Sequence, residues 1–237
     1  MSNSYFSFKQ FTIFQDKCAM KVGIDGVLLG VWTPIEEAKT ILDVGTGTGL
    51  IALMLAQRSQ AEITGIDIEP NAVQQATENV RNSPWSNQIT IQENSLQDFS
   101  TSSNQRFDLI VSNPPYFVDS LKAPSKDRNA ARHTDTLTHE ELIVSAKKLL
   151  TETGRICIIL PVNEGLQCME FAGELGLYCT RSVQVFPKPA INSKRLLLEF
   201  SLIPSAITES ELVIESEIRH HYSPEFTELA KDFYLKL

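Results

Sequence analysis

Two short stretches of this chain combine residue types and spacing that suit group-transfer chemistry. The earlier stretch, Asp43-Val44-Gly45-Thr46-Gly47-Thr48-Gly49, follows an apolar run and places its glycines where the chain turns toward a helix-like segment. Glycine permits a tight turn and lets the backbone approach a ligand closely, as it does in nucleotide-binding folds. Because dinucleotide sites use the same device, this stretch alone predicts only a ligand that contains a nucleoside.

The later stretch, Asn113-Pro114-Pro115-Tyr116, follows another apolar run. Proline has a fixed φ and no N–H, so the turn presents carbonyl oxygens without competing donors. An exocyclic amino group on a base is a poor nucleophile because its lone pair is delocalised into the ring. Hydrogen bonds from this amino group to the Asn113 side-chain oxygen and the Pro114 carbonyl would direct the lone pair toward a methyl donor. Tyr116 offers a face on which the base can stack.

In this order, the two stretches predict an S-adenosylmethionine-dependent methyltransferase that acts on a planar nitrogen. Asp67 ends a strand-like run, where an acid can bind ribose hydroxyls. Asp43 either faces the amino group of the cofactor or braces the turn. This chemistry requires neither a metal nor a strong base, and the cysteines show no ligand spacing, so we expect no metal site. The candidate catalytic residues are Asn113, Pro114, Pro115 and Tyr116.

The segments around these motifs alternate between strand-like and helix-like patterns, which predicts an α/β fold. We expect a Rossmann-like class I methyltransferase sheet of seven strands, mostly parallel, with an antiparallel edge strand and helices on both faces. The expected strands are 40–44, 62–67, 89–93, 107–111, 155–160, 181–186 and 195–202. The expected helices are 50–58, 71–83 with Asn71 as a possible N-cap, 139–150 after a capping box at Thr138, and 162–175.

We expect the 237 residues to form one domain. Residues 1–39 read as an N-terminal extension over the cofactor site, and residues 203–237 as a tail packed on the domain that ends in an aromatic, helix-like stretch. No signal peptide is evident, and the longest apolar helical run, 50–56, is too short for a bilayer. A cytoplasmic protein without membrane contact is therefore expected. The oligomeric state stays open, with a monomer as the expectation.

Any nucleic-acid site in this chain must be a local basic patch, because the formal net charge is −8. Two segments qualify, 119–133 and 181–195, although each is otherwise read as a solvated loop face. Together they are expected to form a basic rim that binds phosphates around a flipped adenine. The candidate RNA-binding residues are Lys122, Arg128, Arg132, Lys188, Lys194 and Arg195.

A further block of the chain resembles a known family. The stretch 8–32, from Phe8-Lys9-Gln10-Phe11 to Val31-Trp32, is similar to the N-terminal signature of bacterial tRNA (adenine-N6)-methyltransferases. These enzymes modify the adenine at position 37, 3′ to the anticodon, of valine tRNA 1. Ser83-Pro84-Trp85 and Asp232-Phe233-Tyr234-Leu235 are also similar, so the resemblance covers essentially the whole chain. It implies tRNA as the partner and N6 of that adenine as the methylated atom.

The resemblance also implies roles for individual residues. Asn113 to Tyr116 look like the platform for the amino group, and the roles of Lys21 and Asp25 stay open. Many relatives place an acid after the third strand to bind the cofactor adenine, whereas this chain has Asn94-Ser95-Leu96 there. A hydroxyl or an amide would replace that acid with a weaker bond. The candidate cofactor-binding residues are Asp43, Gly45, Thr46, Gly47, Gly49, Asp67, Ile68, Ser95, Leu96 and Asn113.

Other functions fit parts of this pattern. A protein glutamine N5-methyltransferase shares the Asn-Pro-Pro-Tyr motif, but such enzymes carry a sizeable helical domain before the first strand, and residues 1–39 do not read as one. An rRNA guanine-N2 methyltransferase is a second alternative. An NAD oxidoreductase leaves the Pro-Pro turn unexplained, and a non-enzymatic RNA-binding module leaves the cofactor motif unexplained.

Overall fold

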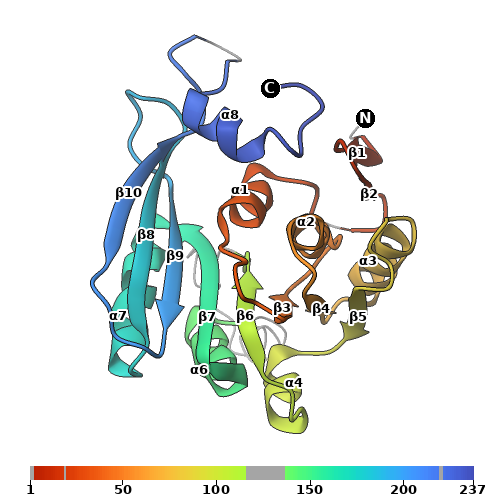
Figure 1. Ribbon diagram of the computed structural model, residues 1–237, viewed down its shortest axis with the longest axis vertical. Helices are drawn as coiled ribbons and strands as arrows, with labels where there is room; N and C mark the ends of the chain where they lie inside the picture. The colour runs from red at the N-terminus through yellow and green to blue at the C-terminus, as the bar shows by residue number, and fades with distance from the viewer. Residues whose placement is uncertain (1–2, 19, 116–136, 219–220) are drawn as a thin grey trace, which may run out of the picture.

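The computed structural model describes residues 3–18, 20–115, 137–218 and 221–237. Within them, an eight-stranded sheet with the strand order β10-β8-β9-β7-β6-β3-β4-β5 forms the centre of the molecule (Figure 1). All neighbouring strands pair in parallel except β9, which is antiparallel to β7 and to β8. The strands are β3 (Thr40–Val44), β4 (Glu62–Asp67), β5 (Ile89–Glu93), β6 (Phe107–Ser112), β7 (Leu150–Pro161), β8 (Tyr178–Phe186), β9 (Arg195–Ser201) and β10 (Thr208–Val213).

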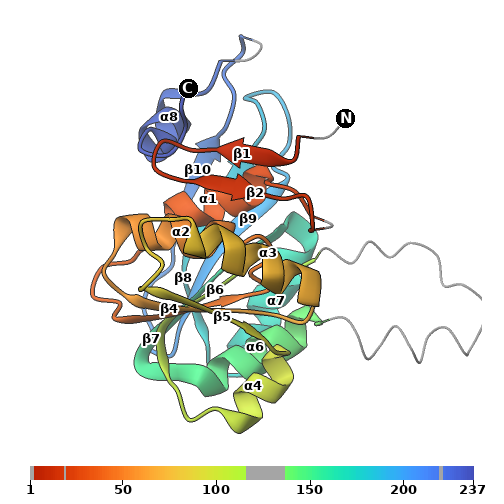
Figure 2. The same ribbon diagram turned by 90° about the vertical axis from the view of Figure 1, so that its right-hand side faces the viewer.

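Helices cover both faces of the sheet (Figures 1 and 2). The upper layer in Figure 1 holds α1 (Ile24–Trp32), α2 (Leu50–Arg58) and α3 (Pro70–Arg81). The lower layer holds α4 (Leu96–Ser102), α6 (His139–Leu149) and α7 (Val162–Glu174). Each layer packs on the sheet through its own cluster of buried apolar side chains. None of the helices in the described ranges is long and apolar enough to cross a membrane.

The expected fold class is confirmed, and the differences lie in its details. The sheet has eight strands where seven were expected, because β10 from the C-terminal tail pairs with β8. The expected N-cap at Asn71 is wrong: α3 begins at Pro70, which suits a first helical position, and Glu69 precedes it. The capping box of Thr138 and Glu141 is confirmed. Helix α4 was not expected, since its short sequence is largely polar.

The two ends of the chain pack against each other above α1 and α2 (Figure 2). Residues 3–14 hold the hairpin β1 (Tyr5–Ser7) and β2 (Thr12–Phe14), and the tail holds α8 (Pro224–Ala230). The Lys9 N–H donates to the Phe233 carbonyl, and the Tyr234 ring contacts the rings of Phe6 and Phe8. The aromatic stretch after α8 is not helical, contrary to expectation; the helix of the tail is α8, which Ser223 caps and Pro224 begins.

Candidate active site

The strand register brings the two chemical motifs together. Val44, the last residue of β3, pairs with Ser112, the last residue of β6. The Ser112 hydroxyl donates to the Val44 carbonyl at 2.9 Å, and both residues are buried. Both strands run in the same direction, so the glycine-rich turn and the Asn113 turn leave the sheet side by side at its carboxyl edge. This edge is where ligands bind in open α/β sheets.

The glycine-rich turn has a backbone shape that only glycine adopts readily. Gly45, Gly47 and Gly49 have φ values of 68°, 57° and 79°. A Cβ at Gly45 would find no atom within 4 Å, so the turn borders open space. The N–H groups of Gly45 and Thr46 donate to the Ile66 carbonyl, which holds the turn against β4. A flat ligand can therefore approach this backbone closely.

Asp67 ends β4 and faces this turn. One carboxylate oxygen accepts the Gly47 N–H at 2.8 Å, and the other accepts the Glu69 N–H at 3.0 Å. Each oxygen keeps a second lone pair, so the carboxylate can still accept two hydroxyl groups. The side chain thus braces the turn and presents an acceptor pair of the kind that a ribose requires.

Asp43 is fully buried behind the turn. Its Oδ2 accepts the Thr46 hydroxyl at 2.6 Å and the Ala52 N–H at 3.2 Å, while its Oδ1 has no partner among the described residues. Burial raises the pKa of this carboxyl to about 7; the bonds from Thr46 and Ala52 oppose the rise, and the charge of Asp67 adds to it. The hydrogen bond from the Thr46 hydroxyl holds the Asp43 side chain in place.

These residues fit a nucleoside sulfonium cofactor with a free ammonium group. The orphan Oδ1 of Asp43 is a buried acceptor that lacks a donor, and an ammonium group would supply one. Ile68 follows Asp67 and is 46% exposed, so it offers an apolar surface that suits a purine ring.

Ser95 and Leu96 occupy the place of the missing adenine-binding acid. Ser95 is the N-cap of α4: its hydroxyl accepts the Asp98 N–H at 3.0 Å and donates to the Asp98 carboxylate at 2.8 Å. One lone pair of this hydroxyl remains for an amino group. The Leu96 side chain is buried in the lower core, so only its backbone can contact a cofactor.

Asn113 follows β6 directly and is half-buried, with Pro114 buried and Pro115 exposed. Its side-chain amide lies beside α1, since a Cβ on Gly26 would come within 3.9 Å of the Asn113 Nδ2. Tyr116 lies outside the described residues, as do Lys122, Arg128 and Arg132. The part of the platform that the structure describes is therefore Asn113, Pro114 and Pro115.

Comparison with known proteins identifies this arrangement. Residues 35–190 match the family model described as a methyltransferase domain. A protein of Parabacteroides distasonis, named tRNA1(Val) (adenine(37)-N6)-methyltransferase, is 52% identical over 100% of both chains. Proteins of Trichodesmium erythraeum and Mannheimia succiniciproducens with the same name are 47% and 45% identical over 100% and 97% of this chain, and over 100% and 94% of their own. The chain belongs to this methyltransferase family.

Solved structures agree on the fold of the methyltransferase. A predicted O-methyltransferase from Agrobacterium tumefaciens superposes with a TM-score of 0.71 at 18% identity, over 88% of this chain and 96% of its own. A ribosomal protein L11 methylase from Lactobacillus delbrueckii subsp. bulgaricus superposes with a TM-score of 0.56 at 18% identity, over 78% and 82% of the two chains. At these identities the likeness concerns the arrangement of strands and helices.

The N-terminal extension of the methyltransferase packs on α3 close to the glycine-rich turn. The Asn79 side chain of α3 bonds the Phe14 backbone and the Thr48 carbonyl, and so ties β2 to the glycine-rich turn. Burial raises the pKa of the Cys18 thiol, and the charge of Asp67 contributes to the rise, so this segment lies near Asp67. The Lys21 ammonium donates to the Gln15 and Cys18 carbonyls, so Lys21 closes this loop.

The basic candidates of segment 181–195 have acidic neighbours. The loop after β8 leads back into β9 at the carboxyl edge, on the same side as Asn113. Lys188 pairs with Glu215 at 3.0 Å, and Arg195 pairs with Asp25 at 2.9 Å. Among the described residues, Lys194 is exposed and has no ion pair. The loop is therefore less positive than its sequence indicates.

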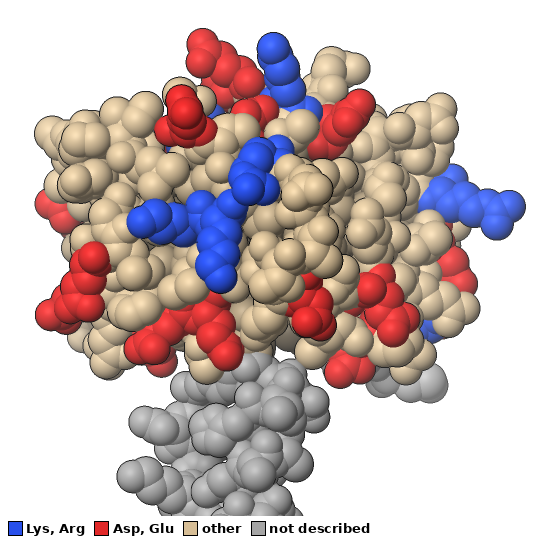
Figure 3. Space-filling model, turned by 90° about the horizontal axis from the view of Figure 1, so that it is seen from below, with Lys and Arg blue, Asp and Glu red and all other residues tan. Residues whose placement is uncertain are grey.

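The lower layer of helices is acidic toward the catalytic edge. Each of these helices begins at that edge and has carboxylates in its first turn, which the helix dipole favours. Figure 3 views this layer from below, with acidic side chains along the lower half and the upper border of the face and a group of basic ones near its centre. An RNA backbone would be repelled here. The first-turn acids are Asp98, Glu140, Glu141 and Glu164.

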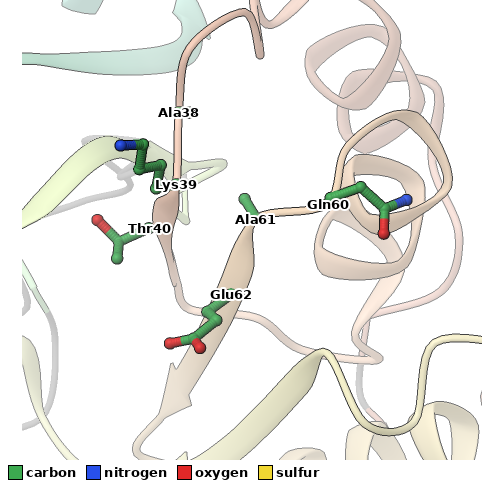
Figure 4. Close-up of a pocket in the computed structure, with 6 residues that line it drawn as sticks. All are labelled: Ala38, Lys39, Thr40, Gln60, Ala61 and Glu62. Carbon is green, nitrogen blue, oxygen red and sulfur yellow. The ribbon is translucent and has the colours of Figure 1, made fainter.

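A separate hollow lies at the opposite end of the strands (Figure 4). It is lined by residues that precede or begin β3 and β4, among them Lys39, Thr40 and Glu62. The Lys39 and Thr40 N–H groups donate to the Asp108 carboxylate at 2.9 and 3.1 Å. The polar groups here brace the amino ends of the strands, so this hollow is distinct from the site of methyl transfer.

The pKa of Asp43 predicts a pH dependence of cofactor binding. An ammonium group stabilises the ionised carboxylate, so binding requires Asp43 to lose a proton that burial retains up to about pH 7. Affinity for S-adenosylmethionine should rise roughly fivefold to tenfold between about pH 6 and pH 7.5. Asp43→Asn should bind more weakly and show no such rise. Calorimetry across this pH range checks both results. A wild-type affinity that does not change with pH would show that Asp43 does not bind the ammonium group of the cofactor.

Proposed function

We propose that this methyltransferase transfers the methyl group of S-adenosylmethionine to N6 of adenine 37 in tRNA1(Val). The observation that carries the proposal is the pairing of Val44 with Ser112, which sets the glycine-rich turn beside the Asn113 turn. Relatives named for this activity are 45–52% identical over nearly the full length of the chain. This pairing supports a donor pocket and an acceptor platform that lie side by side at the carboxyl edge of the sheet.

The chain's own residues do most of this chemistry by placement. When bound, the cofactor supplies an electrophilic methyl group on a sulfonium. Asp67 accepts the ribose hydroxyls, and Asp43 accepts the ammonium. The Asn113 Oδ1 and the Pro114 carbonyl accept the two N–H groups of the adenine amine, which directs its lone pair toward the methyl group. The amine loses its proton to water after the transfer, and we propose that Tyr116 stacks on the base.

Nucleoside analysis tests this function. The enzyme is incubated with labelled S-adenosylmethionine and bulk tRNA from a strain that lacks the gene, and the tRNA is then digested to nucleosides. We expect labelled N6-methyladenosine, and we expect its loss when the tRNA1(Val) transcript carries another base at position 37. Labelled N2-methylguanosine would support a guanine-N2 methyltransferase in place of the proposal. Label found only in glutamine of a protein would support a protein glutamine N5-methyltransferase.

We propose that the loop after β8 contributes to tRNA binding together with segment 119–133. Lys194 is its exposed charge, Lys188 is shared with Glu215, and the charge of Arg195 is offset by Asp25. The acidic lower layer would direct the RNA backbone toward this basic side of the edge.

We also propose that the chain works as a cytoplasmic monomer of one domain. Light scattering of the enzyme, alone and with tRNA, checks that it is a monomer.

Charge reversal in this loop should weaken tRNA binding. The double variant Lys188→Glu, Lys194→Glu should lower affinity at least tenfold at moderate salt and reduce the slope of log K against log salt by about 1 to 2. Lys148→Glu is the matched control, because Lys148 is an exposed lysine in the last turn of α6, at the opposite edge. A wild-type salt slope for the double variant would show that these lysines only solubilise the loop. The pair Arg128→Glu, Arg132→Glu tests the other segment in the same way.

A further inference from the structure

Asp25 and Arg195 meet beside the catalytic turn although 170 positions separate them in the sequence. The Arg195 Nε donates to the Asp25 Oδ2 at 2.9 Å, and the side chains are 27% and 17% exposed for Arg195 and Asp25 respectively. Arg195 opens β9 opposite Pro161, the last residue of β7, so the pair lies at the carboxyl edge. Strand β7 is the neighbour of β6, which ends just before Asn113.

The partner of Arg195 lies on a helix turn next to the Asn113 amide. Asp25 is in the first turn of α1, and Gly26 follows it. A Cβ on Gly26 would lie 3.9 Å from the Asn113 Nδ2 and 3.1 Å from the Leu50 Cδ2. Leu50 is the first residue of α2, immediately after the glycine-rich turn. The first turn of α1 is therefore packed between the acceptor platform and the donor turn.

This helix turn has no side-chain cap to hold it. Gly23 is at the N-cap of α1 and offers no side chain that could accept an N–H of the first turn. The Asp25 carboxylate suits the positive end of the helix dipole, and Arg195 ties it to the sheet. A partly buried ion pair restrains its two elements more strongly than an exposed one, because water and salt screen it less.

We propose that the Asp25–Arg195 pair is a positioning device for Asn113: it holds the first turn of α1 against the Asn113 amide, so that the Asn113 oxygen faces the acceptor amine. The proposal rests on the proposed function to the extent that Asn113 accepts an N–H of a planar amine. It assigns Arg195 to the alignment of the catalytic amide, in place of a phosphate contact. Gly26 then serves as the contact point through which the pair acts.

The two roles of Arg195 predict opposite effects of changing Asp25. If Arg195 bound phosphate, removing the competing carboxylate in Asp25→Asn would strengthen tRNA binding, while Arg195→Gln would weaken it. If the pair positions Asn113, both variants slow methyl transfer and leave the affinities for tRNA and S-adenosylmethionine unchanged. A pair that acts as a unit also makes the double variant no slower than either single one.

The experiment measures single-turnover methyl transfer at saturating cofactor and tRNA, together with both dissociation constants and the unfolding temperature. Asp25→Asn, Arg195→Gln and the double variant should each be about tenfold slower, with both affinities within about twofold of wild type. Glu215→Gln is the matched control, because it breaks the Lys188–Glu215 pair at the same edge, and it should keep the wild-type rate at saturation. Gly26→Ala adds a methyl group 3.9 Å from the Asn113 Nδ2 and should slow transfer severalfold. Because this methyl group also lies 3.1 Å from the Leu50 Cδ2, the unfolding temperature of this variant is measured together with its rate.

Several outcomes would overturn the proposal. A wild-type rate for Asp25→Asn, or independent effects that multiply in the double variant, would show that the pair does not act on Asn113. Opposite shifts in tRNA affinity would assign Arg195 to phosphate. A parallel loss of rate, cofactor affinity and unfolding temperature would show a structural role only. Failure of the proposed function is visible separately, because the wild-type enzyme would then methylate a different nucleoside, on which the same variants are compared.

Discussion

Asn113→Ala should nearly abolish methyl transfer while the enzyme still binds S-adenosylmethionine. Asn113 follows β6 beside the end of β3, and in the proposed mechanism its side chain acts on the acceptor amine and not on the donor. Loss of its oriented acceptor leaves the amine's lone pair delocalised in the ring. Removing a comparable preorganised group lowers turnover by roughly 100-fold or more. Single-turnover rates and calorimetry with S-adenosylmethionine separate the two effects.

A matched asparagine provides the control for this variant. Asn71 is exposed on α3 and does not cap that helix, so Asn71→Ala makes the same chemical change outside the turn that follows β6. It should leave rate and affinity unchanged. A rate for Asn113→Ala within a few-fold of wild type would remove Asn113 from the mechanism, and with it the positioning role of the Asp25–Arg195 pair.

Asp67→Ala should weaken S-adenosylmethionine binding by roughly one to two powers of ten, because charge-assisted bonds to the ribose are lost. The carboxylate also accepts the Gly47 N–H at 2.8 Å, so the variant loosens the glycine-rich turn as well. Asp67→Asn separates the two contributions, since an amide oxygen can still accept the Gly47 N–H but carries no charge. We expect the affinity of Asp67→Asn for S-adenosylmethionine, measured by calorimetry, to lie between those of Asp67→Ala and the wild type.

A carboxylate of similar structural role is the control for Asp67. Asp108 accepts the Lys39 and Thr40 N–H groups at the opposite edge of the sheet. Asp108→Ala should lower the unfolding temperature and leave the affinity for S-adenosylmethionine unchanged. If both aspartate variants lost affinity equally, the loss would reflect general destabilisation. Unchanged affinity in Asp67→Ala would require another ribose partner.

Local sequence patterns were sufficient for the elements that carry the two motifs. The strands 40–44, 62–67 and 89–93 and the helix 50–58 have the bounds that the sequence predicted. Each is a short run with apolar side chains buried against the sheet or the helices, ended by glycine or polar residues, so its limits depend on neighbouring residues only. The same holds for the capping box, because Thr138 and its partner Glu141 are only three residues apart.

Contacts between distant segments decided the rest, and no local pattern encodes them. Strand β10 looks like part of a polar tail until its pairing with β8 is known. Lys188 and Arg195 read as a basic rim, but acids from residues 215 and 25 reach them in the fold. The sequence therefore determined which residues can do the chemistry, while the tertiary structure decided which charges remain available, because a charge depends on the partner that folding places beside it.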